Sequence, residues 1–336
     1  MQYVADSTRY DRMEYRRCGN SGLLLPAISL GLWHNFGDTG NLERMRAICR
    51  TAFDAGITHF DLANNYGPPA GSAEKNFGRI RKEDLAPYRD ELIISTKAGY
   101  DMWPGPYGNF GSRKYLLASL DQSLMRMGLD YVDIFYHHCP DPNTPLEETM
   151  GALAQAVQSG KDLYVGLSNY DGATMQKAAA ILKALHCPFV INQNRYSMLD
   201  RTVERNGLLD ACQTEQKGLI LFSPLAQGLL TDRYLHGSIP ADSRIQTDGR
   251  FLHAAQLTPE LLAKLHALQD LAQQREQSLA QLALCWLLQK QTVTSVLVGA
   301  SRPEQLLDNL QACAAAPLTA AQQQKIDTIL GISAET

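Results

Sequence analysis

The sequence lacks any long run of uncharged apolar residues. No stretch of its 336 residues approaches the roughly 18 such residues that a membrane-spanning helix needs, and residues 1–17 lack the apolar centre of a signal peptide. No run of five like charges occurs and the formal net charge is −4, so the charge pattern argues against a nucleic-acid partner. These absences predict a soluble, cytoplasmic protein that binds neither membrane nor nucleic acid.

Paired cysteines and the common nucleotide-binding motifs are absent too. The seven cysteines are odd in number, scattered and never spaced as CxxC, which favours reduced thiols over a disulfide framework. No GxGxxG follows the first predicted strand, and Gly160-Lys161 is followed by Asp162 rather than by the Ser or Thr of a phosphate-binding loop. We therefore predict no metal site and neither of these two nucleotide sites.

Short apolar runs alternate with stretches of helical spacing along the chain. After Asn41, for example, apolar residues recur at Met45, Ile48 and Phe53. The runs predict buried strands at residues 27–32, 58–63, 91–97, 131–138, 162–169, 189–194, 219–224 and 295–300. Parallel strands need helical crossovers, so eight such units predict a closed (β/α)8 barrel in a single domain, residues 1–336. An open doubly wound sheet is the alternative, and the missing GxGxxG disfavours it.

Other local patterns refine this prediction. Residues 15–26, with an Asn-Ser-Gly turn at 20–22, predict a β-hairpin that caps the bottom of the barrel. Residues 224–257 show little periodicity but carry apolar residues and an arginine, which favours an ordered lid loop. Capping-box spacing at 144–147 and 278–281 predicts two helix starts.

Polar side chains end the predicted strands, where the active sites of (β/α)8 barrels lie. Asp61 ends the second strand, Lys97 the third and His138 the fourth, and Tyr66 follows in a Gly/Pro-rich loop. An ammonium beside a tyrosine lowers the pKa of the phenol, a carboxylate holds the ammonium charged, and a histidine can donate to a substrate oxygen. The four residues predict a proton donor for a carbonyl that is being reduced. A structural ion pair with an adjacent tyrosine and histidine fits the residue types equally well.

The motifs around these residues resemble those of the aldo-keto reductase family over residues 14–330. They are GITHFDLANNYG, IISTKAG, YVDIFYHH, YVGLSNY, INQNRYS, LILFSPLAQGLLTDRY and SVLVGASRPEQLLDNLQA, and their order and spacing match. LANNYGPPAGSAE and KAGYDMWPGPYG are similar to the branch that holds potassium-channel β subunits and bacterial L-glyceraldehyde 3-phosphate reductases.

This resemblance implies roles for the four polar residues. Tyr66 would be the general acid in reduction and Lys97 would tune it. Asp61 would pair with Lys97, and His138 would orient the substrate carbonyl. His137, one residue earlier, is expected to point to the other side of its strand and is given no role.

The resemblance also implies a cofactor, NADPH or NADP+, held without a Rossmann fold. The residues that match cofactor-binding positions of the family are Trp33, Ser168, Asn169, Gln193, Phe222, Ser223, Leu225, Arg233, Gly299, Ser301, Arg302, Gln305 and Asn309. Among them, Ser168, Asn169 and Gln193 match positions that hold the carboxamide, and Phe222 matches an aromatic that stacks on the nicotinamide. Arg302 begins the last barrel helix, which favours the 2′-phosphate of NADPH over NADH.

The implied substrate is a small aldehyde in a pocket lined by Trp33, Met102, Trp103 and Tyr107. Cys139 follows the histidine of the predicted site, where the glyceraldehyde phosphate reductases are expected to have an arginine. The sequence therefore leaves open whether the substrate carries a phosphate.

Other functions stay open at this point. One is a regulatory subunit that binds NADP(H) and senses redox state with little turnover, as the resemblance to channel β subunits implies. Another is a Schiff-base aldolase on Lys97, which Asp61 disfavours because it keeps the amine charged. The resemblance also implies a homo-oligomer, a tetramer or larger, which no residue pattern tests.

Overall fold

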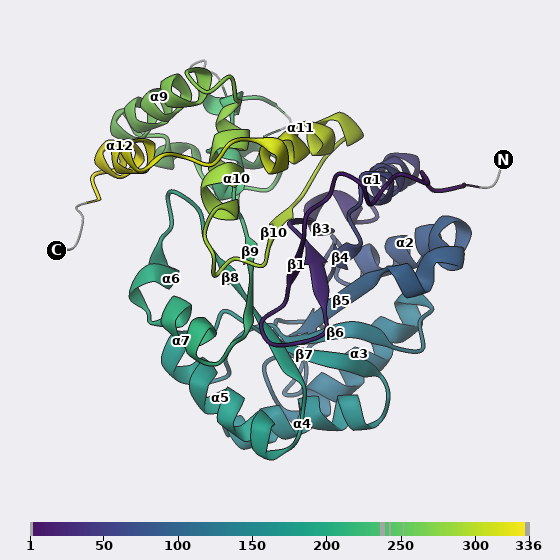
Figure 1. Ribbon diagram of the computed structural model, residues 1–336. Helices are drawn as coiled ribbons and strands as arrows, with labels where there is room; N and C mark the ends of the chain where they lie inside the picture. The colour runs from purple at the N-terminus through teal and green to yellow at the C-terminus, as the bar shows by residue number, and fades with distance from the viewer. Residues whose placement is uncertain (1–2, 236–238, 242, 251, 333–336) are drawn as a thin grey trace.

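The computed structural model describes residues 3–235, 239–241, 243–250 and 252–332. Its centre is a closed parallel barrel with helices around it, in the strand order β10-β3-β4-β5-β6-β7-β8-β9 (Figure 1). The barrel strands are β3 (Ile28–Gly31), β4 (His59–Asp61), β5 (Ile93–Ala98), β6 (Val132–His137), β7 (Asp162–Ser168), β8 (Phe189–Arg195), β9 (Gly218–Phe222) and β10 (Ser295–Val298). The prediction of a (β/α)8 barrel is confirmed, and the open sheet is wrong because β10 pairs with β3 and closes the ring.

Helices fill the crossovers between successive strands, as a parallel barrel requires, and the final two follow the last strand. They are α1 (Leu42–Asp54), α2 (Ser72–Ile80), α3 (Arg113–Met127), α4 (Leu146–Gln158), α5 (Gly172–Ala184), α6 (Thr202–Arg205), α7 (Leu208–Thr214), α8 (Arg244–Thr247), α9 (Pro259–Gln273), α10 (Leu279–Leu288), α11 (Pro303–Ala314) and α12 (Ala320–Leu330). No helix in the described ranges is long and apolar enough to cross a membrane.

The predicted N-terminal hairpin is present and closes the bottom of the barrel. β1 (Tyr15–Arg17) pairs antiparallel with β2 (Leu24–Pro26). The hairpin buries Cys18 and Leu25 against interior side chains of the barrel strands, and the Asn20 N–H donates to the Gln216 carbonyl oxygen at 2.8 Å, just before β9 begins. The polar rim at the opposite end of the strands is therefore the end left for a site.

One of the two predicted capping boxes forms and the other does not. Ser278 and Gln281 cap α10 reciprocally. The box at Thr144 is wrong: α4 starts at Leu146 after Pro145, without a side-chain cap bond. The Asp141 carboxylate accepts the backbone N–H of Thr144 at 3.2 Å, which holds this residue in the preceding turn.

The predicted lid, residues 224–257, is ordered in the part that the structure describes. It contains α8 and short 3₁₀ turns. A separate apolar cluster gives this segment a small core of its own, made by Leu229, Tyr234 and Leu252. Residues 236–238, 242 and 251 of this prediction lie outside the described residues.

Candidate active site

A buried pair, Asp61 and Lys97, lies at the carboxyl ends of β4 and β5. These strands are parallel neighbours with Asp61 opposite Ser95, so Lys97, two residues further on the same face, reaches the carboxylate. Lys97 Nζ donates to Asp61 Oδ2 at 2.5 Å and to the Leu62 carbonyl oxygen at 2.6 Å. Both side chains are at most 2% exposed, and charges this deep persist only when they are paired and hydrogen-bonded.

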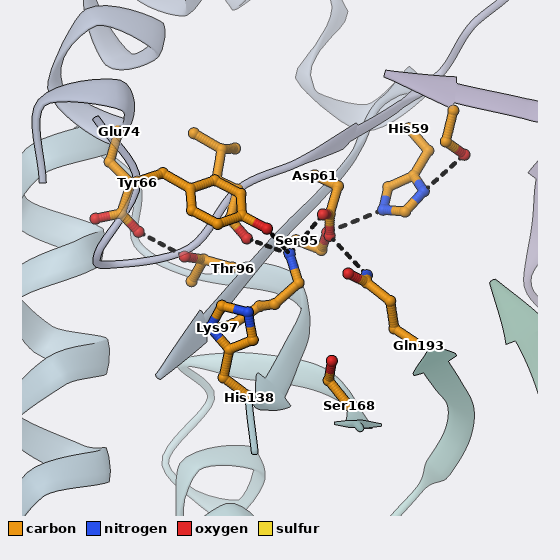
Figure 2. A network of polar contacts seen from close by, with 12 residues as sticks. His59, Asp61, Tyr66, Glu74, Ser95, Thr96, Lys97, His138, Ser168 and Gln193 are labelled. Atoms are coloured by element: carbon orange, nitrogen blue, oxygen red, sulfur yellow. Dashed lines mark hydrogen bonds and ion pairs between the residues drawn. The ribbon is translucent and has the colours of Figure 1, made fainter. Parts of the chain in front are cut away.

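Tyr66 and His138 complete the predicted group, as Figure 2 shows. The Tyr66 hydroxyl lies 3.4 Å from Lys97 Nζ. The rings of Tyr66 and His138 lie edge to face with their centroids 6.0 Å apart. His137 instead places its Nδ1 2.6 Å from the Tyr170 hydroxyl, on the other side of the strand, as the alternation predicts. The structure therefore brings all four predicted residues together and leaves His137 out.

Burial sets the protonation states of these groups. It raises the pKa of Tyr66 well above its ordinary value, and the Asp61 charge raises it further. This corrects the expectation that Lys97 lowers the pKa of the tyrosine, because desolvation dominates at this site. Burial lowers the pKa of Lys97, which Asp61 opposes. Burial and the Lys97 charge hold the pKa of His138 well below 6.5. At neutral pH Tyr66 is therefore protonated and His138 is neutral.

Two more side chains donate to the Asp61 carboxylate. Ser95 Oγ donates to Asp61 Oδ1 at 2.7 Å, and Gln193 Nε2 donates to the same oxygen at 3.2 Å. Gln193 also matches a carboxamide-binding position of the family, and that role stays a prediction. Sequence analysis did not assign Ser95, although a polar residue two positions before Lys97 was the signal that could have found it.

A cavity of about 770 Å³ opens beside this group. Asp61 and Tyr66 form part of its wall. Other lining residues are among the predicted cofactor set, namely Trp33, Phe222, Ser223, Leu225, Arg233, Gly299, Ser301, Arg302 and Gln305. Arg244 and Asp248 of the lid also line it and were not predicted.

The rest of the predicted cofactor set lies outside this lining. Ser168 ends β7, and Asn169 Nδ2 donates to the His138 carbonyl oxygen at 2.9 Å. Asn309 on α11 is 2% exposed. Within the described residues its Nδ2 is buried without a hydrogen-bond partner.

The predicted substrate pocket is assembled only in part. Trp33 lines the cavity with its ring centroid 6.1 Å from that of Tyr66. Met102 and Trp103 line a separate, more open recess. Tyr107 is 53% exposed and lines neither space. Their shared loop therefore stands beside the main cavity rather than in its wall.

Two residues that sequence analysis did not assign lie near the group. The Tyr100 ring packs against His138 with centroids 4.6 Å apart. Arg195, exposed at the end of β8, places its guanidinium carbon 5.8 Å from the Phe222 ring centroid. Burial raises the pKa of Tyr100, and the Arg195 charge opposes this rise.

The family is decided by comparison with known proteins. The model of the Aldo/keto reductase family matches residues 27–330. The chain belongs to this family. It is 62% identical over 317 residues to the L-glyceraldehyde 3-phosphate reductase of Escherichia coli (strain K12), covering 93% of this chain and 91% of that protein. A probable voltage-gated potassium channel subunit beta of Oryza sativa subsp. japonica is 34% identical over 310 residues, covering 91% and 93%.

A solved thermostable aldo-keto reductase, in complex with the inhibitor epalrestat, has the same fold. Its TM-score is 0.74 at 30% identity, with 94% of this chain and 100% of that chain covered. The resemblance read from the motifs is thus confirmed, and this aldo-keto reductase is an oxidoreductase of carbonyl compounds. The family generally uses NADP(H).

Proposed function

We propose that this aldo-keto reductase reduces small aldehydes to alcohols with NADPH, and that Tyr66 donates the proton. The observation that carries the proposal is a Tyr66 hydroxyl 3.4 Å from Lys97 Nζ, in the wall of a cavity large enough for a cofactor. Burial keeps the phenol protonated, which is the form a general acid needs.

Each residue of the site has a separate role at the carbonyl group of the substrate. Bound NADPH supplies a hydride to the carbonyl carbon. Tyr66 gives its proton to the oxygen as negative charge develops there, and the Lys97 ammonium stabilises the phenolate that remains. Neutral His138 donates a hydrogen bond that orients the carbonyl. Asp61 keeps Lys97 charged and in place. In the reverse direction, the Tyr66 phenolate accepts the proton of the alcohol.

The cavity residues fit NADPH. Phe222, at the end of β9, offers an aromatic face in the cavity wall. Arg302 lines the cavity from the start of α11, and no ion pair to it occurs within the described residues. The buried Nδ2 of Asn309 on the same helix lacks an acceptor that a bound adenosine would supply. The Arg302 cation supports NADPH over NADH, because only NADPH carries a 2′-phosphate, whereas the Asn309 donor would serve either cofactor.

The proposed substrates include L-glyceraldehyde 3-phosphate, which is the substrate in the name of the 62% identical relative. Cys139 is buried and neutral, because burial raises the pKa of its thiol to about 11. It offers no charge to a phosphate. Arg195 is a cation at the end of β8 beside Phe222 at the end of β9, and it is our candidate for the phosphate contact.

The regulatory function is less well supported. Relatives named as channel β subunits are 34–35% identical, well below the 62% of the named reductase. The four residues of the predicted catalytic tetrad, Asp61, Tyr66, Lys97 and His138, are also present and assembled here. An aldolase on Lys97 fits poorly, since Nζ already donates to Asp61 and to the Leu62 carbonyl oxygen. A cytoplasmic location and a homo-oligomer stay predictions.

The experiment that tests the proposal measures NADPH oxidation and NADPH binding separately. Purified protein is given L-glyceraldehyde 3-phosphate, methylglyoxal and 4-nitrobenzaldehyde, and loss of the reduced nicotinamide absorbance is followed. We expect turnover that depends on Tyr66. Tight NADPH binding without turnover of any of the three aldehydes would contradict a reductase and support the regulatory function.

A further inference from the structure

A line of polar side chains runs through the interior of the barrel and ends on the Asp61 carboxylate. Ser295 Oγ lies 2.7 Å from Ser29 Oγ, and Ser29 Oγ lies 2.9 Å from His59 Nδ1. His59 Nε2 lies 2.9 Å from Ser95 Oγ, which donates to Asp61 at 2.7 Å. Figure 2 shows how the upper part of this line leads from His59 to Asp61.

This placement is unusual for a barrel of this kind. None of the five residues is more than 1% exposed, and such interiors are ordinarily filled by branched apolar residues. Burying hydroxyls and an imidazole is costly unless each finds a partner. In this line each buried polar group has a hydrogen-bond partner. The line is continuous and ends on Asp61 of the tetrad, which points to a role in the reaction.

Counting hydrogens gives the line a direction. A carboxylate only accepts, so Ser95 uses its single hydrogen on Asp61. The Ser95 oxygen must then accept from His59, which places a hydrogen on Nε2. Neutral His59 therefore has a bare Nδ1 that accepts from Ser29, and the single hydrogen of Ser295 goes either to Ser29 or to the Pro26 carbonyl oxygen. From Ser29 onward, every hydrogen of the line points toward Asp61.

The end of the line at Asp61 is the same in both charge states of His59. A protonated imidazole would donate to Ser29 and Ser95 together, and Ser29 would turn its hydrogen to Ser295. Ser295 would then donate to the Pro26 carbonyl oxygen, 2.7 Å away. Burial lowers the pKa of His59 to about 4, so the neutral form holds at neutral pH. Ser95 still donates to Asp61 in either case.

We propose that His59 and Ser95 are positioning residues of the reductase. His59 orients the Ser95 hydroxyl, which donates a fixed hydrogen bond to Asp61 Oδ1 and so holds Lys97 Nζ close to the Tyr66 hydroxyl. Gln193 is a weaker second donor to that oxygen at 3.2 Å. Lys97 occupies the other carboxylate oxygen. The donor from Ser95 fixes the plane of the carboxylate, and the plane sets where Nζ lies.

Few titratable groups lie close to this line. His59 is acted on by Asp61 and Lys97. The titratable groups around Lys97 are Asp61, Tyr66, Glu74, Tyr136 and His138. A changed pH dependence on loss of Ser95 would therefore report on the Asp61–Lys97 pair.

The test compares substitutions along the line, and it rests on the proposed role of Tyr66. Ser95→Ala removes the donor to Asp61, and His59→Leu removes the group that directs it. We expect each to lower kcat about tenfold and to move the acid limb of its pH profile up by about one unit, with KM for the aldehyde and NADPH binding little changed. His59→Gln keeps an N–H donor near the Nε2 position and should restore most of the profile.

A double variant and a matched control sharpen the result. Ser95→Ala with His59→Leu should match Ser95→Ala alone, because His59 acts through Ser95. Ser119→Ala removes another fully buried serine hydroxyl, which lies on α3 and belongs neither to the line nor to the tetrad. It controls for the loss of a buried hydroxyl and should keep the wild-type kcat and pH profile.

The outcomes separate this inference from the proposed function. If Tyr66→Phe keeps its turnover, the proposed function fails. If Tyr66→Phe is inactive while folded Ser95→Ala has the wild-type kcat and profile, only the positioning role is overturned. A His59→Gln protein as impaired as His59→Leu would also overturn it. Ser95→Ala decides the matter even if His59→Leu does not fold.

Discussion

Removing the Tyr66 hydroxyl should separate catalysis from folding. Tyr66→Phe deletes one oxygen atom whose contact in the structure is Lys97 Nζ at 3.4 Å. That distance is well beyond the usual 2.9 Å or so of a strong hydrogen bond. The ring contacts with Trp33 and His138 stay. The free energy of unfolding should therefore fall by less than about 1 kcal/mol.

The kinetic effect of the same change should be much larger. A positioned general acid contributes about 10²- to 10⁴-fold to the rate. At about 1.4 kcal/mol for each factor of ten, this is about 3–5 kcal/mol of transition-state stabilisation. Since the hydroxyl is the proposed source of the transferred proton, we expect kcat for aldehyde reduction to fall at least about 100-fold.

The assay pairs three measurements on the wild type and Tyr66→Phe. Steady-state NADPH oxidation gives kcat, nicotinamide fluorescence gives the Kd of NADPH, and thermal melting gives Tm. We expect kcat alone to change. A loss of kcat smaller than about tenfold would refute Tyr66 as the proton donor. A large loss of NADPH binding would instead show that the hydroxyl serves the cofactor.

Other predictions follow from single residues of the site and core. Arg302→Ala should raise the Kd of NADPH about tenfold or more and leave that of NADH nearly unchanged, and equal losses would exclude a 2′-phosphate contact. Arg195→Gln should raise KM about tenfold for L-glyceraldehyde 3-phosphate and not for methylglyoxal, and a uniform change would contradict a phosphate contact. Burial lowers the pKa of His137 to about 4, below an unfolded value of about 6.5, so the unfolded state binds more protons between these values. The free energy of unfolding should therefore fall by about 2 kcal/mol from pH 7 to pH 5 on account of this residue, and urea unfolding of His137→Asn should show a shallower decline, whereas an unchanged slope would contradict the assignment.

The barrel was predictable because of how its strands are buried. A strand covered by helices on one face and by the interior on the other is apolar on both, so it appears as a short continuous apolar run. Eight such runs with helical stretches between them leave little choice of fold. Since the carboxyl ends of all barrel strands meet on one rim, Asp61, Lys97 and His138 could be placed together without coordinates.

The substrate loop and the protonation states were not predictable in this way. Met102, Trp103 and Tyr107 share a loop whose direction depends on tertiary contacts, and the structure sets it beside the main cavity. The pKa of Tyr66 depends on how completely the surrounding side chains exclude water. Desolvation of the phenol outweighs the nearby ammonium, and residue types alone do not reveal that balance.

By itself, the sequence determined the family, the barrel and the four tetrad residues, because these depend on local patterns and on a common rim. Only the tertiary structure showed which buried polar groups support Asp61. Ser29 and Ser295 are 266 residues apart and touch because barrel closure sets β3 beside β10. His59 and Ser95 join them because one face of every strand points inward. Contacts between distant strands leave no periodicity in the sequence, so this line to the active site had to be seen in the folded chain.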